Sequence, residues 1–157
     1  MLGYAELARR TPDPLQLFDL MNDLAKIVVR NVEATSGVVI KFIGDACLLA
    51  FGVENADECV LSIRTLVAQC EQHLRQTGRR NKFKATVHFG EVAIGLFGLA
   101  PQQRIDVLGD PVNKAATLGN GIHRGGIILS TQAFERLSDS TKTLFRKTTS
   151  GDVYTSE

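Results

Sequence analysis

The sequence predicts an α/β sandwich, in which one mainly antiparallel sheet carries helices on one face. Two long segments repeat apolar residues at helical spacing, and each is followed by short runs typical of strands. The expected order is helix, hairpin, helix, hairpin, strand, helix, strand, helix. Two hairpins that alternate with two long helices favour this arrangement over other fold classes.

The first half of the chain is expected to contain a long helix, a hairpin and a second long helix. Asp13 and Pro14 are typical of a helix N-cap and of the first helical position. A Gly-Asp pair between two apolar runs is typical of a tight hairpin turn. The expected elements are a helix from Pro14 to about Ser36, strands at about 38–43 and 46–51, and a helix from about Asn55 to Gln76.

The second half is expected to contain further strands and two shorter helices. Strands at about 83–89 and 92–98 would form a second hairpin around Gly90 and Glu91. After them we expect a strand at about 104–107, a helix from about Pro111 to Leu118, a strand at about 126–129 and a last helix capped by Thr131.

The composition favours one folded domain, and we interpret residues 1–157 as a single domain. The chain is 44% hydrophobic and 22% charged, and its formal net charge of +1 argues against a nucleic-acid partner. No apolar run approaches the length of a membrane span, so no direct membrane contact is expected from this domain. Three cysteines without metal-site or disulfide spacing indicate reduced thiols and a cytoplasmic location.

The segment from Lys41 to Asp45 is the first candidate for chemistry. It reads Lys-Phe-Ile-Gly-Asp, and the Asp would stand at the tip of the first hairpin. A carboxylate there has its oxygens free, and Mg²⁺ and Mn²⁺ prefer oxygen ligands while leaving room for phosphate oxygens. Asp45 is therefore a candidate metal ligand. The alternative is an ordinary hairpin in which the Asp only helps to form the turn.

Two further segments complete a recognisable set. Residues 87–95 read Val-His-Phe-Gly-Glu-Val-Ala-Ile-Gly, and residues 104–118 read Arg-Ile-Asp-Val-Leu-Gly-Asp-Pro-Val-Asn-Lys-Ala-Ala-Thr-Leu. Together with residues 41–45, this set resembles the class III nucleotide cyclase catalytic domain over roughly residues 2–135. Each segment alone is a weak signal, whereas the three in order and at similar spacing are a strong one.

The resemblance implies a ferredoxin-like βαββαβ core, which normally opens with a strand before the first helix. The segment from Met1 to Leu7 resembles the stretch just after that strand. The first strand and the family's first metal-binding Asp would then precede Met1. We therefore expect the sequence to be a fragment of a longer chain, or to start one residue too late.

The resemblance also implies the reaction. In the family, the ribose 3′-oxygen attacks the α-phosphorus and pyrophosphate leaves, with two Mg²⁺ or Mn²⁺ ions per active site. Asp45 matches the second metal-binding carboxylate, and Met1 matches a position whose backbone carbonyl helps to hold a metal. The N–H groups of Gly3, Tyr4 and Ala5 would face the nucleotide phosphates. A frayed terminus is the alternative for residues 1–5.

Lys41 and Asp106 match the pair that reads the purine in adenylate cyclases. Adenine offers ring-nitrogen acceptors and an amino donor, and a Lys supplies donors while an Asp supplies acceptors. Guanine reverses the pattern at position 6, and guanylate cyclases typically carry Glu and Cys instead. The pair therefore implies ATP as the substrate. The alternatives are a solvated lysine at a strand edge and a turn residue before Gly109.

Asn113 matches the family residue that orients the ribose, although helix-start capping would also explain an Asn there. Four residues later the family usually carries an Arg that stabilises charge on the α-phosphate, and this chain has Thr117. A hydroxyl does not replace a guanidinium, so activity could be weak or absent. Arg124 is a candidate substitute. The family's phosphate-binding Lys, in a Lys-Gly motif, has no match between Lys147 and Tyr154.

Together these matches imply an adenylate cyclase that converts ATP to 3′,5′-cyclic AMP and pyrophosphate. It would act as a homodimer with active sites at the interface, fused to a regulatory module. Asp45 would serve a site together with Lys41, Asp106 and Asn113 of the partner. One alternative is a degenerate cyclase domain that binds nucleotide or a partner and regulates a fused module without turnover. An unrelated ferredoxin-like interaction domain would leave the three segments unexplained.

Overall fold

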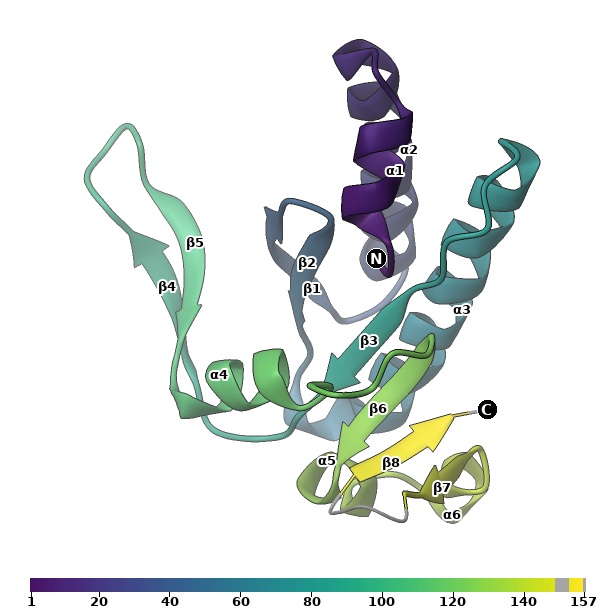
Figure 1. Cartoon of the computed structure of the whole chain (residues 1–157). Helices are drawn as coiled ribbons and strands as arrows, with labels where there is room; N and C mark the ends of the chain where they lie inside the picture. Colours follow the sequence, from purple (N-terminus) through teal and green to yellow (C-terminus); the bar gives the residue numbers. More distant parts are fainter. Residues whose placement is uncertain (149–152, 157) are drawn as a thin grey trace.

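The computed structural model describes residues 1–148 and 153–156, and it combines helices with mainly antiparallel strands as predicted (Figure 1). The helices are α1 (Tyr4–Arg10), α2 (Pro14–Glu33), α3 (Ala56–Gln76), α4 (Asp110–Thr117), α5 (Thr131–Glu135) and α6 (Asp139–Lys142), with a 3₁₀ turn η1 at Val53–Asn55. The strands are β1 (Val38–Ile43), β2 (Ala46–Ala50), β3 (Lys84–Val87), β4 (Ala93–Phe97), β5 (Arg104–Leu108), β6 (Gly126–Ser130), β7 (Phe145–Lys147) and β8 (Val153–Ser156).

Helix α2 begins where the sequence predicts. The Asp13 carboxylate accepts a hydrogen bond of 2.9 Å from the Leu15 N–H, and Pro14 occupies the first turn, where its missing N–H costs nothing. The helix ends at Glu33, slightly earlier than expected, and the Thr35 hydroxyl donates to the Val32 carbonyl at 2.6 Å. A side-chain hydroxyl thus satisfies one of the carbonyls that a helix end leaves without a partner.

Two apolar clusters form the core, and α3 contributes to both. The first joins α1, α2 and α3, and the second joins α3 to β6 and to the short elements after it. The buried residues of the first cluster are Leu7, Leu20, Leu24, Val28, Val32, Leu66, Cys70 and Leu74. Those of the second are Val60, Ile63, Ile127, Leu129, Ala133, Leu137 and Phe145. Because the two clusters share one helix, α3 fixes the body of the fold.

The strands form three sheets in the described part of the chain. They are the antiparallel hairpin β1–β2, the sheet β3–β6–β8–β7, and the antiparallel pair β4–β5. In the second sheet β3 and β6 run parallel, whereas β8 is antiparallel to both of its neighbours. Strands β7 and β8 are not expected from the sequence, because three- and four-residue runs are too short to show a clear alternation.

The predicted second hairpin around Gly90 and Glu91 is wrong. Strand β3 pairs with β6, while β4 pairs with β5 across the turn that follows Phe97. Close packing at Gly90 separates the two strands, because a Cβ atom there would lie 2.4 Å from Cγ of Pro111. The chain therefore passes the start of α4 at this point and does not turn back on itself.

The last helices are short and well capped. Ser130, one residue before the predicted cap at Thr131, accepts a hydrogen bond from the Ala133 N–H through its hydroxyl. Ser138 caps α6 in the same way through the Thr141 N–H. The rings of Phe134 and Tyr154 stack with centroids 3.6 Å apart, which fastens α5 to β8.

The β4–β5 hairpin projects away from the body of the molecule (Figure 1). Val107 of β5 is buried, but most of the hairpin's large apolar side chains are exposed: Ile94, Leu96, Phe97, Leu99, Ile105 and Leu108. Scattered apolar residues on a surface are ordinary, but a projecting hairpin rich in them is typical of an interaction surface. No helix among the described residues has the length and apolar character needed to cross a membrane.

Replacement of Leu74 by Ala tests the importance of the first core cluster. Leu74 is 0% exposed, so the truncation leaves a cavity between α2 and α3 and should lower the free energy of unfolding by about 2–5 kcal/mol. Urea denaturation followed by circular dichroism measures the loss. Leu15→Ala is the matched control, because Leu15 is 73% exposed and its truncation should cost less than about 0.5 kcal/mol. Equal losses in the two variants would contradict the assignment of the core.

Candidate functional site

Lys41 on β1 and Asp106 on β5 meet although 65 positions separate them in the sequence. The Lys41 ammonium donates to both carboxylate oxygens of Asp106, at 2.8 and 2.9 Å. Both side chains keep access to solvent, with 41% of Lys41 and 22% of Asp106 exposed. The structure therefore brings together the two residues that the sequence predicts to read a base, and it leaves the pair reachable for a ligand.

The pKa of Asp106 lies below the usual value of an aspartate. The hydrogen bond from Lys41 is the largest cause, and the Val107 N–H, which donates to Asp106 Oδ1 at 2.8 Å, adds to it. Both donors favour the ionised carboxylate, so Asp106 is a hydrogen-bond acceptor at neutral pH. Its second lone pairs remain available to a donor from a bound molecule.

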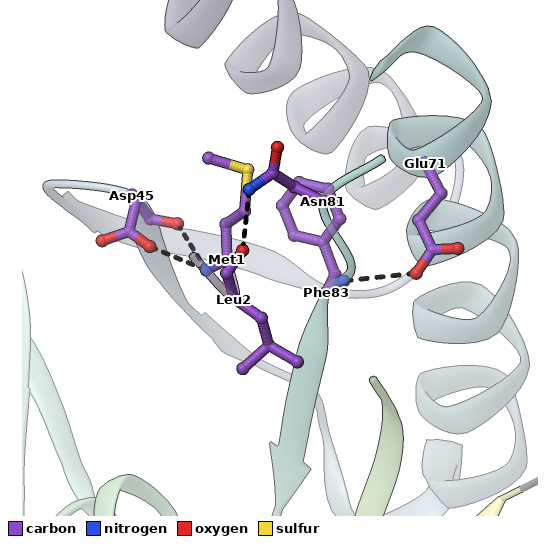
Figure 2. Close-up of polar contacts among 6 residues, drawn as sticks. All are labelled: Met1, Leu2, Asp45, Glu71, Asn81 and Phe83. Carbon is purple, nitrogen blue, oxygen red and sulfur yellow. Dashed lines mark hydrogen bonds and ion pairs between the residues drawn. The ribbon is translucent and has the colours of Figure 1, made fainter. Parts of the chain in front are cut away.

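Asp45 stands at the tip of the β1–β2 hairpin, directly after Gly44, whose φ of +58° suits a glycine. Its carboxylate accepts a hydrogen bond from outside the turn. Figure 2 shows that the amino group of Met1 donates to Asp45 Oδ2 at 2.8 Å and lies 3.4 Å from the Asp45 carbonyl oxygen. The structure thus joins the two predicted metal-binding positions, and a positive group already faces the Asp45 carboxylate.

The segment from Met1 to Gly3 lies between the first hairpin and the loop before β3 (Figure 2). The Leu2 N–H donates to the Lys82 carbonyl at 2.8 Å, and the Asn81 side-chain amide donates to the Leu2 carbonyl at 2.9 Å. Glu71 in turn accepts from the Phe83 N–H and pairs with Lys82, which fastens that loop to α3. These contacts give residues 1–3 a defined path in the structure.

Gly3 is the N-cap of α1, so Tyr4 and Ala5 form the first turn of that helix. The φ of Gly3 is +75°, and a Cβ atom there would lie 3.1 Å from Nδ2 of Asn81. A glycine therefore suits this position both for its backbone angle and for its contact with the loop. The three residues predicted to face the phosphates lie together at the start of the helix, close to Asp45 through Met1.

Helix α4 carries Asn113 and Thr117, which lie four residues apart on one face. Gly109 is the N-cap, so Asn113 lies inside the helix, and the interpretation of Asn113 as a capping residue is wrong. Its side chain is instead available at the surface. The Thr117 hydroxyl donates to the Asn113 carbonyl at 2.9 Å, which holds that hydroxyl against the helix backbone.

Lys84 on β3 fixes the far end of α4. Its ammonium donates to the Gly119 carbonyl at 2.8 Å and to the Ile122 carbonyl at 3.3 Å, in the turn that follows the helix. A cation is well placed there because the carbonyl end of a helix carries partial negative charge. At the other end, Pro111 packs on Gly90. Helix α4 is thus held at both ends against the segment that contains β3.

Arg124 does not take the place of the Arg absent at position 117. Its guanidinium donates to the Thr155 hydroxyl on β8, so it serves the sheet rather than α4. Residues 149–152, which form part of the stretch from Lys147 to Tyr154 where the family's phosphate-binding Lys has no match, lie outside the described residues.

A hollow of about 510 Å³ lies beside α4, and the sequence analysis does not predict it. His88, Lys114, Thr117 and Gln132 are among the residues that line it. Nδ1 of His88 is buried without a hydrogen-bond partner in the described part of the chain. Burial, with the nearby charge of Lys114, lowers the pKa of His88, although Asp110 opposes this shift. The imidazole is therefore neutral at pH 7.

The cysteines behave as structural residues, as predicted. Burial raises the pKa of Cys59 and of Cys70 to about 12, and burial also raises the pKa of Cys47. Thiols with such pKa values stay protonated and are poor nucleophiles. Covalent catalysis by a thiol therefore has no support from the structure.

The donor set near Asp45 suits a hard cation that a ligand helps to hold. Within residues 1–148 and 153–156, no three His, Cys, Asp or Glu side chains gather closely enough to bind a metal alone. Mg²⁺ commonly uses one or two protein carboxylates and completes its shell with water and substrate phosphates. Asp45, whose carboxylate stands at the tip of the first hairpin beside the backbone of Met1, fits that role.

The comparisons with known sequences identify the family. A family profile described as the adenylate and guanylate cyclase catalytic domain matches residues 1–156. An adenylate cyclase of Anabaena cylindrica is 27% identical over 125 residues, covering 74% of this chain and 24% of that protein. A receptor-type guanylate cyclase, gcy-13 of Caenorhabditis elegans, is 27% identical over 148 residues, covering 88% of this chain and 14% of that protein. The chain spans a quarter or less of the length of these two relatives.

Solved structures confirm the predicted α+β cyclase fold. The adenylyl cyclase CyaB from P. aeruginosa has a TM-score of 0.78 and 18% identity, covering 99% of this chain and 88% of that one. The guanylate cyclase domain of RhGC from Catenaria anguillulae, in complex with GTP, has a TM-score of 0.75 and 18% identity, covering 97% and 87%. A dimeric guanylyl cyclase domain from Blastocladiella emersonii has a TM-score of 0.73 and 15% identity, covering 98% and 89%.

The Lys41–Asp106 pair, the hairpin Asp and the Asn of α4 stand in a fold and a sequence context that the family profile matches over almost the whole length. This chain is a class III nucleotide cyclase domain and belongs to the family of adenylate and guanylate cyclase catalytic domains.

Proposed function

We propose that this cyclase domain converts ATP to 3′,5′-cyclic AMP and pyrophosphate. The observation that carries the choice of ATP is the bidentate contact between Lys41 and Asp106, because it keeps a donor and an ionised acceptor side by side. Adenine has an amino donor and a ring-nitrogen acceptor on one edge, and these complement Asp106 and Lys41 respectively. Guanine carries an oxygen acceptor at position 6, which the Asp106 carboxylate would repel.

The chain's own groups would mainly position and neutralise the substrate. Asn113 would hold the ribose by its amide, and the N–H groups of Gly3, Tyr4 and Ala5 would face the phosphates. Asp45, with the backbone at Met1, would hold Mg²⁺ or Mn²⁺, which supplies charge neutralisation on the phosphates and activation of the 3′-oxygen.

A homodimer would complete each site. The exposed apolar side chains of the β4–β5 hairpin support an interface between two copies, and one of the structures similar to this chain is itself a dimer, described as non-canonical. In the proposed dimer, the metal-binding Asp45 of one copy serves the site whose base- and ribose-binding residues come from the partner. A two-fold axis then generates two equal sites.

Formation of cyclic AMP from Mn²⁺-ATP is the direct test. The chain at high protein concentration should form cyclic AMP. Asp45→Asn should reduce the rate by about two orders of magnitude, because a neutral amide binds the cation poorly. Liquid chromatography of the products measures both, with GTP as the competing substrate. Nucleotide binding without product would instead favour a regulatory domain without turnover, for which Thr117 gives some support.

Mixing two inactive variants tests the shared site. Asp45→Asn and Asn113→Ala should each inactivate the homodimer. In a one-to-one mixture, about half of the dimers are mixed and each has one intact site, so about a quarter of the activity should return. Two Asp45→Asn preparations mixed together are the control and should stay inactive. No recovery in the first mixture, with dimers present by light scattering, would place each site within a single chain.

Titration of Asp106 tests the pair that reads the base. Lys41→Met should raise the pKa of Asp106 towards the usual aspartate value, because it removes the largest cause of the lowered pKa. In the original chain, the stabilisation from this contact is present above the usual pKa of Asp and is lost as the pH falls through the lowered one. NMR of the carboxyl carbons follows the titration.

Lys26→Met is the matched control for that titration. Lys26 pairs with Asp23 on α2 and likewise lowers the pKa of its partner. Its replacement should raise the pKa of Asp23 and leave that of Asp106 unchanged. If Asp106 titrates at the same pH with and without Lys41, the pair does not exist in solution and the argument for ATP loses its basis.

A further inference from the structure

Lys114, on α4, lines the hollow beside that helix and brings a positive charge to it. It follows Asn113 directly and precedes Thr117 by three residues, so on a helix Thr117 lies between the faces of the other two. Thr117 also lines the hollow. A long lysine side chain at position 114 can therefore extend past Thr117 towards the face that carries Asn113.

Other cations around α4 are committed to structural contacts. Lys84 donates to the carbonyls after α4, Lys41 is paired with Asp106, and Arg124 donates to the sheet hydroxyl of Thr155. Lys114 differs, because its partner is Asp110, one turn earlier on the same helix, at 2.7 Å. Both side chains are largely exposed, at 58% and 71%. Exposed pairs of this kind contribute little, so a more highly charged anion can take the lysine from Asp110.

The reaction proposed above needs positive charge near the phosphates of the nucleotide. Negative charge develops on the transferred phosphoryl group, and a hydroxyl such as that of Thr117 offers one weak donor, which here is already used on the Asn113 carbonyl. The neighbouring wall of the hollow adds neutral polar groups, namely the His88 imidazole and the Gln132 amide. Lys114 is thus the charged member of an otherwise neutral polar wall.

We propose that Lys114 is a catalytic residue, which contacts the phosphates of the bound nucleotide and supplies at α4 the positive charge that Thr117 cannot. This inference rests on the proposed nucleotide cyclase activity. It gives three residues of one helix different roles. Asn113 holds the ribose, Thr117 leaves space beside it, and Lys114 extends past Thr117 to the phosphates. The amino group moves from Asp110 to the phosphates, and no bond is made or broken by it.

Steady-state kinetics with Mn²⁺-ATP test the role. Lys114→Gln should lower kcat/KM by about 10- to 100-fold, and Lys114→Arg should retain most of the activity, because it keeps the charge. Lys26→Gln is the matched control: it removes an exposed helical lysine with an equivalent ion pair on α2 and should leave the rate unchanged. The melting temperature of each variant shows whether the fold is retained.

A second background separates a catalytic role from a structural one. In Thr117→Arg, the guanidinium supplies the charge from the neighbouring position, so Lys114→Gln should then cost less than about threefold. Binding of inorganic pyrophosphate, measured by calorimetry without turnover, should weaken in Lys114→Gln and recover in the double variant. A structural role would give the same loss in both backgrounds.

The outcomes are distinguishable. If the original chain forms no cyclic nucleotide, the proposed function fails and this inference fails with it. If the chain is active and Lys114→Gln matches the Lys26→Gln control, only the role of Lys114 is overturned. If Lys114→Gln lowers kcat/KM equally in the original chain and in the Thr117→Arg background, the role of Lys114 is also overturned. If Lys114→Gln lowers kcat/KM only in the original chain and also weakens pyrophosphate binding, the role of Lys114 is supported.

Discussion

The contact between Lys41 and Asp106 links two parts of the molecule that share no sheet. Strand β1 belongs to the first hairpin and β5 to the projecting one, and the described strands of these hairpins form separate sheets. The projecting hairpin has exposed apolar side chains and little packing against the core. Its position relative to the first hairpin, and with it the proposed base-reading edge of the site, therefore depends on this ion pair, on the buried Val107 of β5 and on the contacts of the exposed apolar surface.

Helix α4 is held independently of that contact. The approach of Pro111 to Gly90 fixes the start of the helix, and the Lys84 ammonium fixes the turn after it. Both partners belong to the segment around β3, which α3 and β6 bury in the second core cluster. The proposed ribose- and phosphate-binding face thus rests on the second core cluster, whereas the proposed base-reading pair lies between two hairpins.

The sequence predicts local structure well and strand partners poorly. Asp13 and Pro14 mark the start of α2, and the Gly-Asp turn marks the first hairpin, because these signals act within a few residues. The parallel pairing of β3 with β6 joins residues about 40 positions apart, and no local pattern encodes it. Lys41 and Asp106 could be paired in advance only through the family resemblance. The role proposed for Lys114 has no local signal in the sequence, because a lysine four residues after an Asp resembles an ordinary surface pair.

The charges of the site are paired before any ligand arrives. Asp45 faces the Met1 amino group, Asp106 faces Lys41, and Asp110 faces Lys114. The Lys41–Asp106 and Asp110–Lys114 pairs keep access to solvent, so each contributes little to stability and can be exchanged for a contact with a ligand. In the proposed reaction, the phosphates would take Lys114 from the exposed Asp110. Asp110, which loses its partner, is exposed and is then solvated. Nucleotide binding therefore exchanges one ion pair for another and leaves no buried charge without a partner.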